Sequence, residues 1–138
     1  MLRVTVEELT ARLPGTLPEL LGFEIVDLRR GCIKARMPVE PRHLAPNGFL
    51  HAASIIALAD TACGMATIAH LPGGAENFTT IELKNNFLGT TRNGVVACEA
   101  KPAHLGRTTQ VWDADVADES SGRIIAVFRC TQMILWPR

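Results

Sequence analysis

The stretch of sequence that decides the fold is Asn47-Gly48-Phe49-Leu50-His51-Ala52-Ala53-Ser54-Ile55-Ile56-Ala57-Leu58-Ala59-Asp60-Thr61-Ala62-Cys63-Gly64-Met65. A loop leads through His51 into a long apolar segment, and Pro72-Gly73-Gly74 ends it, which predicts a helix from about His51 to His70. Many of its side chains are alanine, glycine, serine or threonine. Because small side chains let strands approach on several sides, we expect a central helix wrapped by a curved sheet.

One carboxylate, Asp60, lies in the middle of this apolar segment. Burying an aspartate is costly unless it is paired or neutralised. Catalysis is one explanation, since catalytic sites collect perturbed acids. The other is a structural aspartate that is hydrogen-bonded to a hydroxyl such as that of Thr61 or Thr67.

Composition limits the possible functions. The 138 residues predict one domain over 1–138, in which 1–19 form a helical lead-in. The chain has 14 basic and 14 acidic residues, so nothing favours nucleic acid, and a net charge of zero is compatible with oligomers. The N-terminus lacks the apolar core of a signal peptide, and the apolar run is short and interrupted for a membrane span.

Four cysteines lie far apart in the chain, at Cys32, Cys63, Cys98 and Cys130. They form no CxxC pair and no metal-like pattern with histidine. We interpret them as small buried hydrophobic residues in a reducing compartment. The sequence therefore predicts a cytoplasmic protein with no metal site and no membrane or nucleic-acid partner.

The remaining elements are read from alternation and turn signals. A helix starts at Thr5 and is interrupted at Pro14-Gly15. Strands are predicted at about 24–28, 32–37, 78–88, 94–104, 107–117 and 123–135, and residues 39–50 are predicted to form a loop. The order of helix, two strands, long helix and four strands is that of an α+β fold with an antiparallel sheet.

Two motifs in this order resemble a known family. The first is Gly48, His51 and Leu58-Ala59-Asp60-Thr61-Ala62, and the second is Lys101-Pro102, His104, Gly106-Arg107 and Gln110-Val111-Trp112. They resemble the hotdog-fold, PaaI-like acyl-CoA thioesterases, including the Arthrobacter-type 4-hydroxybenzoyl-CoA thioesterase. The resemblance implies a homodimer or dimer of dimers that hydrolyses an acyl-CoA without a cofactor, since CoA is part of the substrate.

The chain departs from that family at two places. The family typically has His-Gly-Gly at the helix start, where this chain has His51-Ala52-Ala53, and often has glutamine or asparagine where this chain has Ala45. Asn47 could replace that residue only if the loop bends differently. These departures keep open a non-catalytic acyl-CoA-binding protein. A hotdog dehydratase is less favoured, because the chain has no D-x4-H motif.

Thioester hydrolysis needs a nucleophile or base and a donor for the oxyanion. The backbone N–H of Ala52, at the helix N-terminus, is the candidate donor, although Ala52 and Ala53 could simply be helix formers. Asp60 is the candidate nucleophile, which forms a mixed anhydride, or the general base, which activates water. His51 either binds the thioester carbonyl or holds the loop.

Helix geometry constrains this site. Ala52 and Asp60 are eight residues apart, or about 12 Å along one helix, too far to serve one carbonyl. Antiparallel helices from two subunits would bring Ala52 of one chain near Asp60 of the other. The sequence therefore predicts two sites at a two-fold dimer interface.

The rest of the site is implied by the resemblance. The segment His104-Leu105-Gly106-Arg107-Thr108-Thr109 would contact pantetheine and nucleotide, with Arg107 on phosphate or, alternatively, a solvated charge at a strand end. Phe87-Leu88-Gly89-Thr90 would line the other side of the channel, with Thr80 nearby. Thr61 and Gly64 would line the cleft, although close helix packing explains the glycine equally well. Phe49, Met65 and Phe87 indicate only an apolar acyl pocket.

Overall fold

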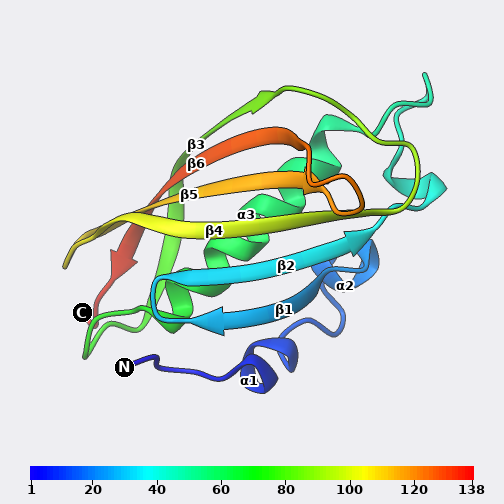
Figure 1. Cartoon of the computed structure of the whole chain (residues 1–138). Coiled ribbons are helices and arrows are strands. Elements are labelled where there is room, and N and C mark those ends of the chain that lie inside the picture. The colour runs from blue at the N-terminus through cyan, green and yellow to red at the C-terminus, as the bar shows by residue number, and fades with distance from the viewer.

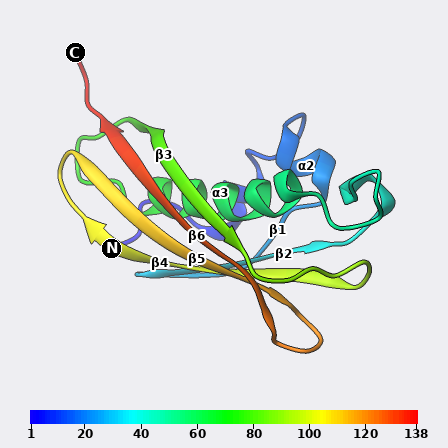
Figure 2. The same ribbon diagram turned by 90° about the horizontal axis from the view of Figure 1, so that it is seen from above.

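The structure, a computed structural model, describes all of residues 1–138. A single antiparallel sheet of six strands curves around one long helix, α3 (Figures 1 and 2). The spatial order of the strands is β1-β2-β4-β5-β6-β3, which leaves β1 and β3 at the two edges. The bounds are α1 Val6–Thr10, α2 Leu17–Leu21, β1 Glu24–Arg29, β2 Cys32–Pro38, α3 Ala52–Ala69, β3 Asn77–Phe87, β4 Val95–Leu105, β5 Thr109–Asp118 and β6 Ile124–Leu135.

The small residues of α3 form its contact with the sheet. Ala59, Ala62, Cys63 and Ala66 are fully buried, in one core with sheet residues such as Ile33, Val96, Trp112 and Ile125. A Cβ added to Gly64 would lie only 3.1 Å from Cζ of Phe78 on β3. The expected wrapped helix is confirmed, and the reason is steric, because larger side chains would hold the strands away.

By length and composition alone α3 is long and apolar enough to cross a membrane, but 56% of it is buried inside this fold. We therefore interpret it as the core helix of the domain. The four cysteines are also buried and form no disulfide, as expected for small hydrophobic side chains. Cys32, Cys98 and Cys130 lie on strands, and Cys63 lies on α3.

Both ends of α3 carry a histidine as the cap. His51 precedes the first turn, and its Nδ1 accepts a hydrogen bond of 2.9 Å from the N–H of Ala53. His70 follows the last turn, and its Nε2 accepts the N–H of Gly31 in the β1–β2 turn at 2.8 Å. Its Nδ1 is 2.7 Å from the carbonyl of Ala66, and burial lowers the pKa of the imidazole, which keeps it neutral and bridging.

The N-terminal region contains a second helix that the sequence analysis did not predict. Thr5 and Glu8 form a capping box at the start of α1, as the threonine suggested. After Pro14-Gly15 the chain forms α2, which begins after Thr16, has Pro18 in its first turn and ends at Gly22 with φ +79°. These are ordinary start and stop signals, but five residues are too few to show a helical hydrophobic period.

The other differences are small. The predicted loop 39–50 contains a 3₁₀ turn, Pro41–His43, and an isolated bridge between Leu44 and Leu50. The last four strands begin and end within two residues of the predicted bounds. The largest shift is at β5, which begins at Thr109 because the N–H of Gly106 donates to the carbonyl of Thr109 at 2.8 Å and closes the preceding turn.

Candidate active site

Asp60 lies on the flank of α3 with its side chain half-buried. Its Oδ1 atom is buried and has no hydrogen-bond partner. The two hydroxyls that a structural role would have used do not bind it, and that of Thr67 donates to the carbonyl of Cys63 instead, at 2.8 Å. Burial raises the pKa of the Asp60 carboxyl above its ordinary value. Asp60 is thus a partly desolvated acid that no neighbour neutralises.

The N-terminus of α3 presents a free donor. The imidazole of His51 accepts the N–H of Ala53, and the His51 carbonyl accepts that of Ser54 at 2.9 Å. The N–H of Ala52 makes no hydrogen bond, and Ala52 is exposed. An exposed N–H at the positive end of a long helix suits a developing negative charge. In this structure His51 caps the helix and leaves the neighbouring donor available.

The loop before α3 is held by its own hydrogen bonds. The Oδ1 of Asn47 accepts the N–H of Phe49 at 3.2 Å, and Gly48 between them has φ +86°, a conformation that favours glycine. The hydroxyl of Ser54 donates to the carbonyl of His43 at 2.8 Å. In this structure, therefore, the Asn47 carbonyl oxygen shapes the loop.

The sheet register separates the two segments predicted to line one channel. Phe87, at the end of β3, pairs with Ala126, whereas Thr109, at the start of β5, pairs with Met133 at the other end of β6. Phe87–Thr90 therefore lies near the start of β6, and the His104–Thr109 loop lies near its end. The two partners lie seven positions apart on β6, about 23 Å of strand.

Each segment lies near a different end of α3. The guanidinium of Arg92, just after Thr90, lies 4.8 Å from the ring centroid of Phe49, in the loop before the helix. At the other end Gln110 donates to the carbonyl of His70 at 2.9 Å. The helix between them has 18 residues, about 27 Å. Within one chain, therefore, the two segments predicted to line one channel lie far apart.

The other predicted contact residues are placed individually. The hydroxyl of Thr80 donates to Oε1 of Gln132 at 2.6 Å, and Thr61 is half-buried beside Asp60. Gly64 packs against the ring of Phe78, so the structure supports the interpretation of this glycine as a close-packing residue. Exposed residues are Phe87, Leu88, His104, Leu105, Arg107 and Thr108, whereas Gly89, Thr90, Gly106 and Thr109 are half-buried.

Asn85 is a residue that the sequence analysis missed. Both polar atoms of its amide are buried without a partner. It pairs across the sheet with the buried Phe128, which places it on the inner face of β3 with Leu83 and Phe87. The other unpaired buried side-chain atoms belong to Asp60, Thr90 and Gln132. The strand alternation within Leu83-Lys84-Asn85-Asn86-Phe87 was the signal that could have found it.

The unpaired amide leads to a prediction about stability. Asn85→Leu is expected to raise the free energy of unfolding by about 1 to 2 kcal/mol, because it removes an uncompensated buried amide from an apolar face. Denaturant unfolding measures the change. Asn86→Leu, on the exposed outer face of the same strand, is the control and is expected to leave stability within about 0.5 kcal/mol. A less stable Asn85→Leu would show that the amide is paired in solution.

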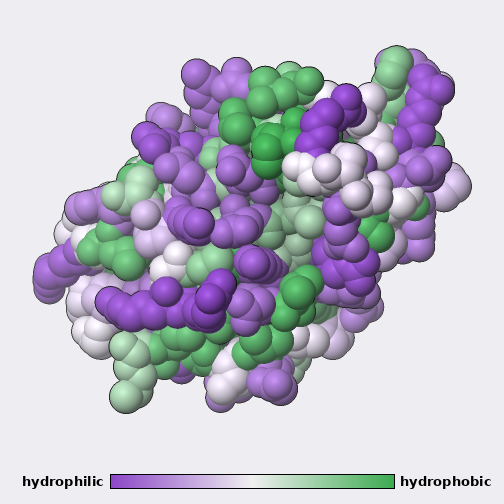
Figure 3. All heavy atoms as spheres, in the orientation of Figure 1, coloured by the Kyte–Doolittle hydropathy of each residue, from purple (hydrophilic) through white to green (hydrophobic).

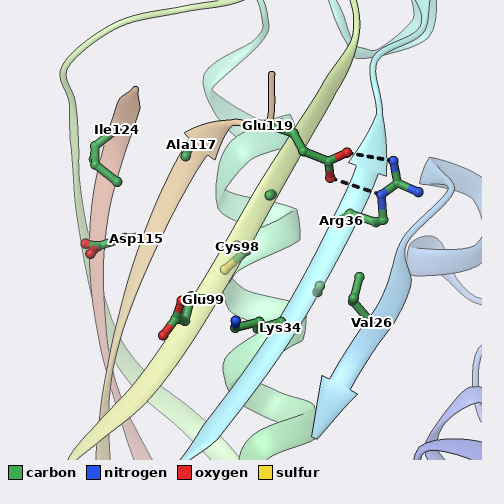
Figure 4. Close-up of a pocket in the computed structure, with 11 residues that line it drawn as sticks. Val26, Lys34, Arg36, Cys98, Glu99, Asp115, Ala117, Glu119 and Ile124 are labelled. Carbon is green, nitrogen blue, oxygen red and sulfur yellow. Dashed lines mark hydrogen bonds and ion pairs between the residues drawn. The ribbon is translucent and has the colours of Figure 1, made fainter. Parts of the chain in front are cut away.

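A groove of about 360 Å³ lies elsewhere, on the outer face of the sheet (Figure 4). Its lining combines small or apolar residues, such as Cys98, with charged side chains. The ion pair between Arg36 and Glu119, 2.9 Å long, lies at one side. It contains none of the predicted site residues. The candidate active site is therefore the flank and N-terminus of α3, away from this groove.

Comparison with known proteins identifies the family of the chain. The model of the Thioesterase superfamily matches residues 47–125. ComA2 of Bacillus subtilis (strain 168) is 35% identical over 120 residues, which cover 87% of this chain and 94% of that protein. The 1,4-dihydroxy-2-naphthoyl-CoA hydrolase of Escherichia coli (strain K12) is 30% identical over 133 residues, 96% of each chain.

A solved structure shows the same architecture. A mutant of thioesterase PA1618 from Pseudomonas aeruginosa has a TM-score of 0.90 and 29% identity, and the match covers 96% of this chain and 95% of that one. The curved sheet and the central helix agree with the hotdog fold expected from the sequence. The chain belongs to the thioesterase superfamily, and it is a thioester hydrolase with a hotdog fold.

Proposed function

We propose that the protein hydrolyses an acyl-CoA to the free acid and CoA at a site shared by two copies of the chain. One observation carries this proposal: the free N–H of Ala52 and the unpaired carboxylate of Asp60 lie on one helix, about 12 Å apart. Neither group has another task in the single chain. The distance is too long for both to act on one carbonyl unless a second chain supplies one of them.

In the proposed mechanism the thioester carbonyl oxygen accepts the N–H of Ala52, which stabilises the oxyanion as the carbonyl carbon is attacked. Asp60 of the other chain is either the nucleophile or the base. As nucleophile it displaces CoA as the thiolate and forms a mixed anhydride, which water then cleaves. As base it takes a proton from the attacking water and returns it to the departing sulfur. His51 supports the site by capping the helix.

The edge strand β3 supports the dimer. Its exposed hydrophobic residues include Ile81 (53% exposed), Leu83 (39%) and Phe87 (46%), and hydrophobic atoms gather at the upper edge of the molecule, over the end of β3 (Figure 3). A long, apolar, unpaired edge strand is normally covered. Two antiparallel copies of β3 would cover each other, in a dimer or in each half of a dimer of dimers.

The same two-fold symmetry would bring the two sides of the proposed channel together. A two-fold axis across β3 places the N-terminal end of α3 in one chain opposite the C-terminal end in the other. Phe87–Thr90 of one chain then approaches Thr80 and the His104–Thr109 loop of its partner. The two segments that the register separates within a chain thus meet between chains, which supports CoA binding in that channel.

The kind of acyl group is inferred from the apolar residues that could bind it. Phe49, Met65 and Phe87 are proposed to form an apolar acyl pocket, and the E. coli relative, named for an aromatic CoA thioester, favours an aryl acyl group among the possibilities. We propose that the reaction needs no cofactor. Four buried, unpaired thiols support a reducing, cytoplasmic environment.

The experiment is a panel of aryl, short-chain and medium-chain acyl-CoAs, with a thiol reagent to detect released CoA. Release of CoA together with an equal amount of free acid is the expected result. Binding of acyl-CoA without hydrolysis would instead favour a non-catalytic acyl-CoA-binding protein. Two features support that alternative: Ala45 stands where the family often has glutamine or asparagine, and the side chain of Asn47 is hydrogen-bonded within its own loop. Light scattering on the same preparation measures the oligomeric state.

A further inference from the structure

The C-terminal Trp136 holds the loop that carries Arg107. The guanidinium of Arg107 lies 4.4 Å from the centroid of the Trp136 ring, and the indole N–H donates to the carbonyl of Arg107 at 3.0 Å. The N–H of Ile134 donates to the carbonyl of Thr108 at 2.9 Å. Side chain and backbone of the loop are thus both attached to the end of β6.

Trp136 is itself anchored to the body of the protein. It packs, with Phe78, against a small hydrophobic cluster of Leu71, Ala75 and Ile134. Phe78 in turn contacts Gly64, one turn after Asp60 on α3. Packed side chains therefore connect the Arg107 loop to the helix that carries the proposed catalytic acid.

The hydrogen-bonding groups of Arg107 remain free. Its side chain donates no hydrogen bond and forms no ion pair, and the residue is exposed. Stacking on an indole occupies the flat face of a guanidinium and leaves its N–H edge for another group. That edge is suited to a bidentate contact with phosphate. A solvated arginine without a role would not need to be held at two points.

We propose that Trp136 is a positioning residue for CoA, which orders Arg107 before the phosphates of CoA arrive. This inference rests on the proposed function. Fixing the side chain in advance removes part of the entropy cost of binding. The effect is expected at the nucleotide end of CoA, because the free edge of the Arg107 guanidinium matches a phosphate and only that end of the substrate carries phosphates.

The test compares Trp136→Leu, Trp136→Phe, Arg107→Ala and the double variant. Trp136→Leu keeps an apolar side chain on the cluster but removes the stacking surface and the indole N–H. It is expected to raise KM for acyl-CoA, and the dissociation constant of free CoA by calorimetry, roughly three- to tenfold, with kcat unchanged. An acyl-N-acetylcysteamine, which lacks the nucleotide, is expected to show no change. Trp136→Phe, which keeps a stacking ring, should recover part of the loss.

The double variant separates positioning from general destabilisation. If Trp136 acts through Arg107, removing it from Arg107→Ala adds little further loss of CoA affinity. Leu135→Ala, on the opposite face of the same strand end, is the control and should leave CoA affinity unchanged. Equal losses on the truncated thioester, or fully additive losses in the double variant, would overturn the inference. A wild type that hydrolyses no acyl-CoA would overturn the proposed function, and calorimetry with CoA would still decide the role of Trp136.

Discussion

Asp60→Asn is expected to lower kcat for acyl-CoA by on the order of a hundredfold or more while CoA still binds. Asparagine keeps the size of the side chain, so the groups around it on α3 need not move. It removes the carboxylate that acts as nucleophile or base. Steady-state kinetics with a thiol reagent measure the change, and calorimetry with CoA measures binding. Asp115→Asn, on the exposed outer face of the sheet, is the matched control and should retain full turnover.

The pH dependence provides a second check on Asp60. Burial raises the pKa of its carboxyl, and only the ionised form can attack or take a proton. Turnover should therefore fall as the pH drops through this raised pKa, at a higher pH than an ordinary aspartate would give. Because the folded state holds the proton more tightly than the unfolded chain, ionisation of Asp60 costs stability as the pH rises.

Asp60→Asn should consequently unfold at a higher denaturant concentration than the wild type at neutral pH, while its turnover is lost. Such opposite changes in stability and activity are typical of a catalytic group whose charge is kept in a desolvated environment, and not of a structural group. Turnover close to that of the wild type in Asp60→Asn would contradict the assignment of the acid.

The second large effect concerns the shared site. Ala52→Trp is expected to abolish turnover, because the indole would fill the space in front of the free N–H at the start of α3. Asp60→Ala is expected to be inactive as well. When the two variants are mixed and allowed to exchange subunits, each mixed dimer contains one site with an intact Ala52 and an intact Asp60. Random exchange of equal amounts should restore about one quarter of wild-type activity.

Subunit exchange itself must be shown, for example by energy transfer between differently labelled chains. Each variant mixed with a labelled copy of itself is the control and should stay inactive. Exchange without recovery of activity, or a fully active monomer by light scattering, would rule out the shared site.

The sequence alone determined the central part of this protein. The long run of alanine, glycine, serine and threonine between His51 and His70 predicted a helix that strands could approach closely, and α3 is buried in that way. Hydrophobic alternation located all six strands. Asp60 was found because a lone acid in an apolar segment is visible without any knowledge of its neighbours. All these signals are local, and they repeat over enough residues to be read from one chain.

The tertiary structure decided the features that depend on distant residues. The helix α2 has only five residues, so its bounds are defined by its capping residues and not by a repeating pattern of hydrophobic residues. The separation of Phe87–Thr90 from the His104–Thr109 loop follows from the register of β5, β6 and β3, which joins residues up to 58 positions apart. The contact of Trp136 with Arg107 likewise joins residues that are 29 positions apart. Sequence patterns report which face of an element is apolar, but pairing between elements is decided only when the whole core packs.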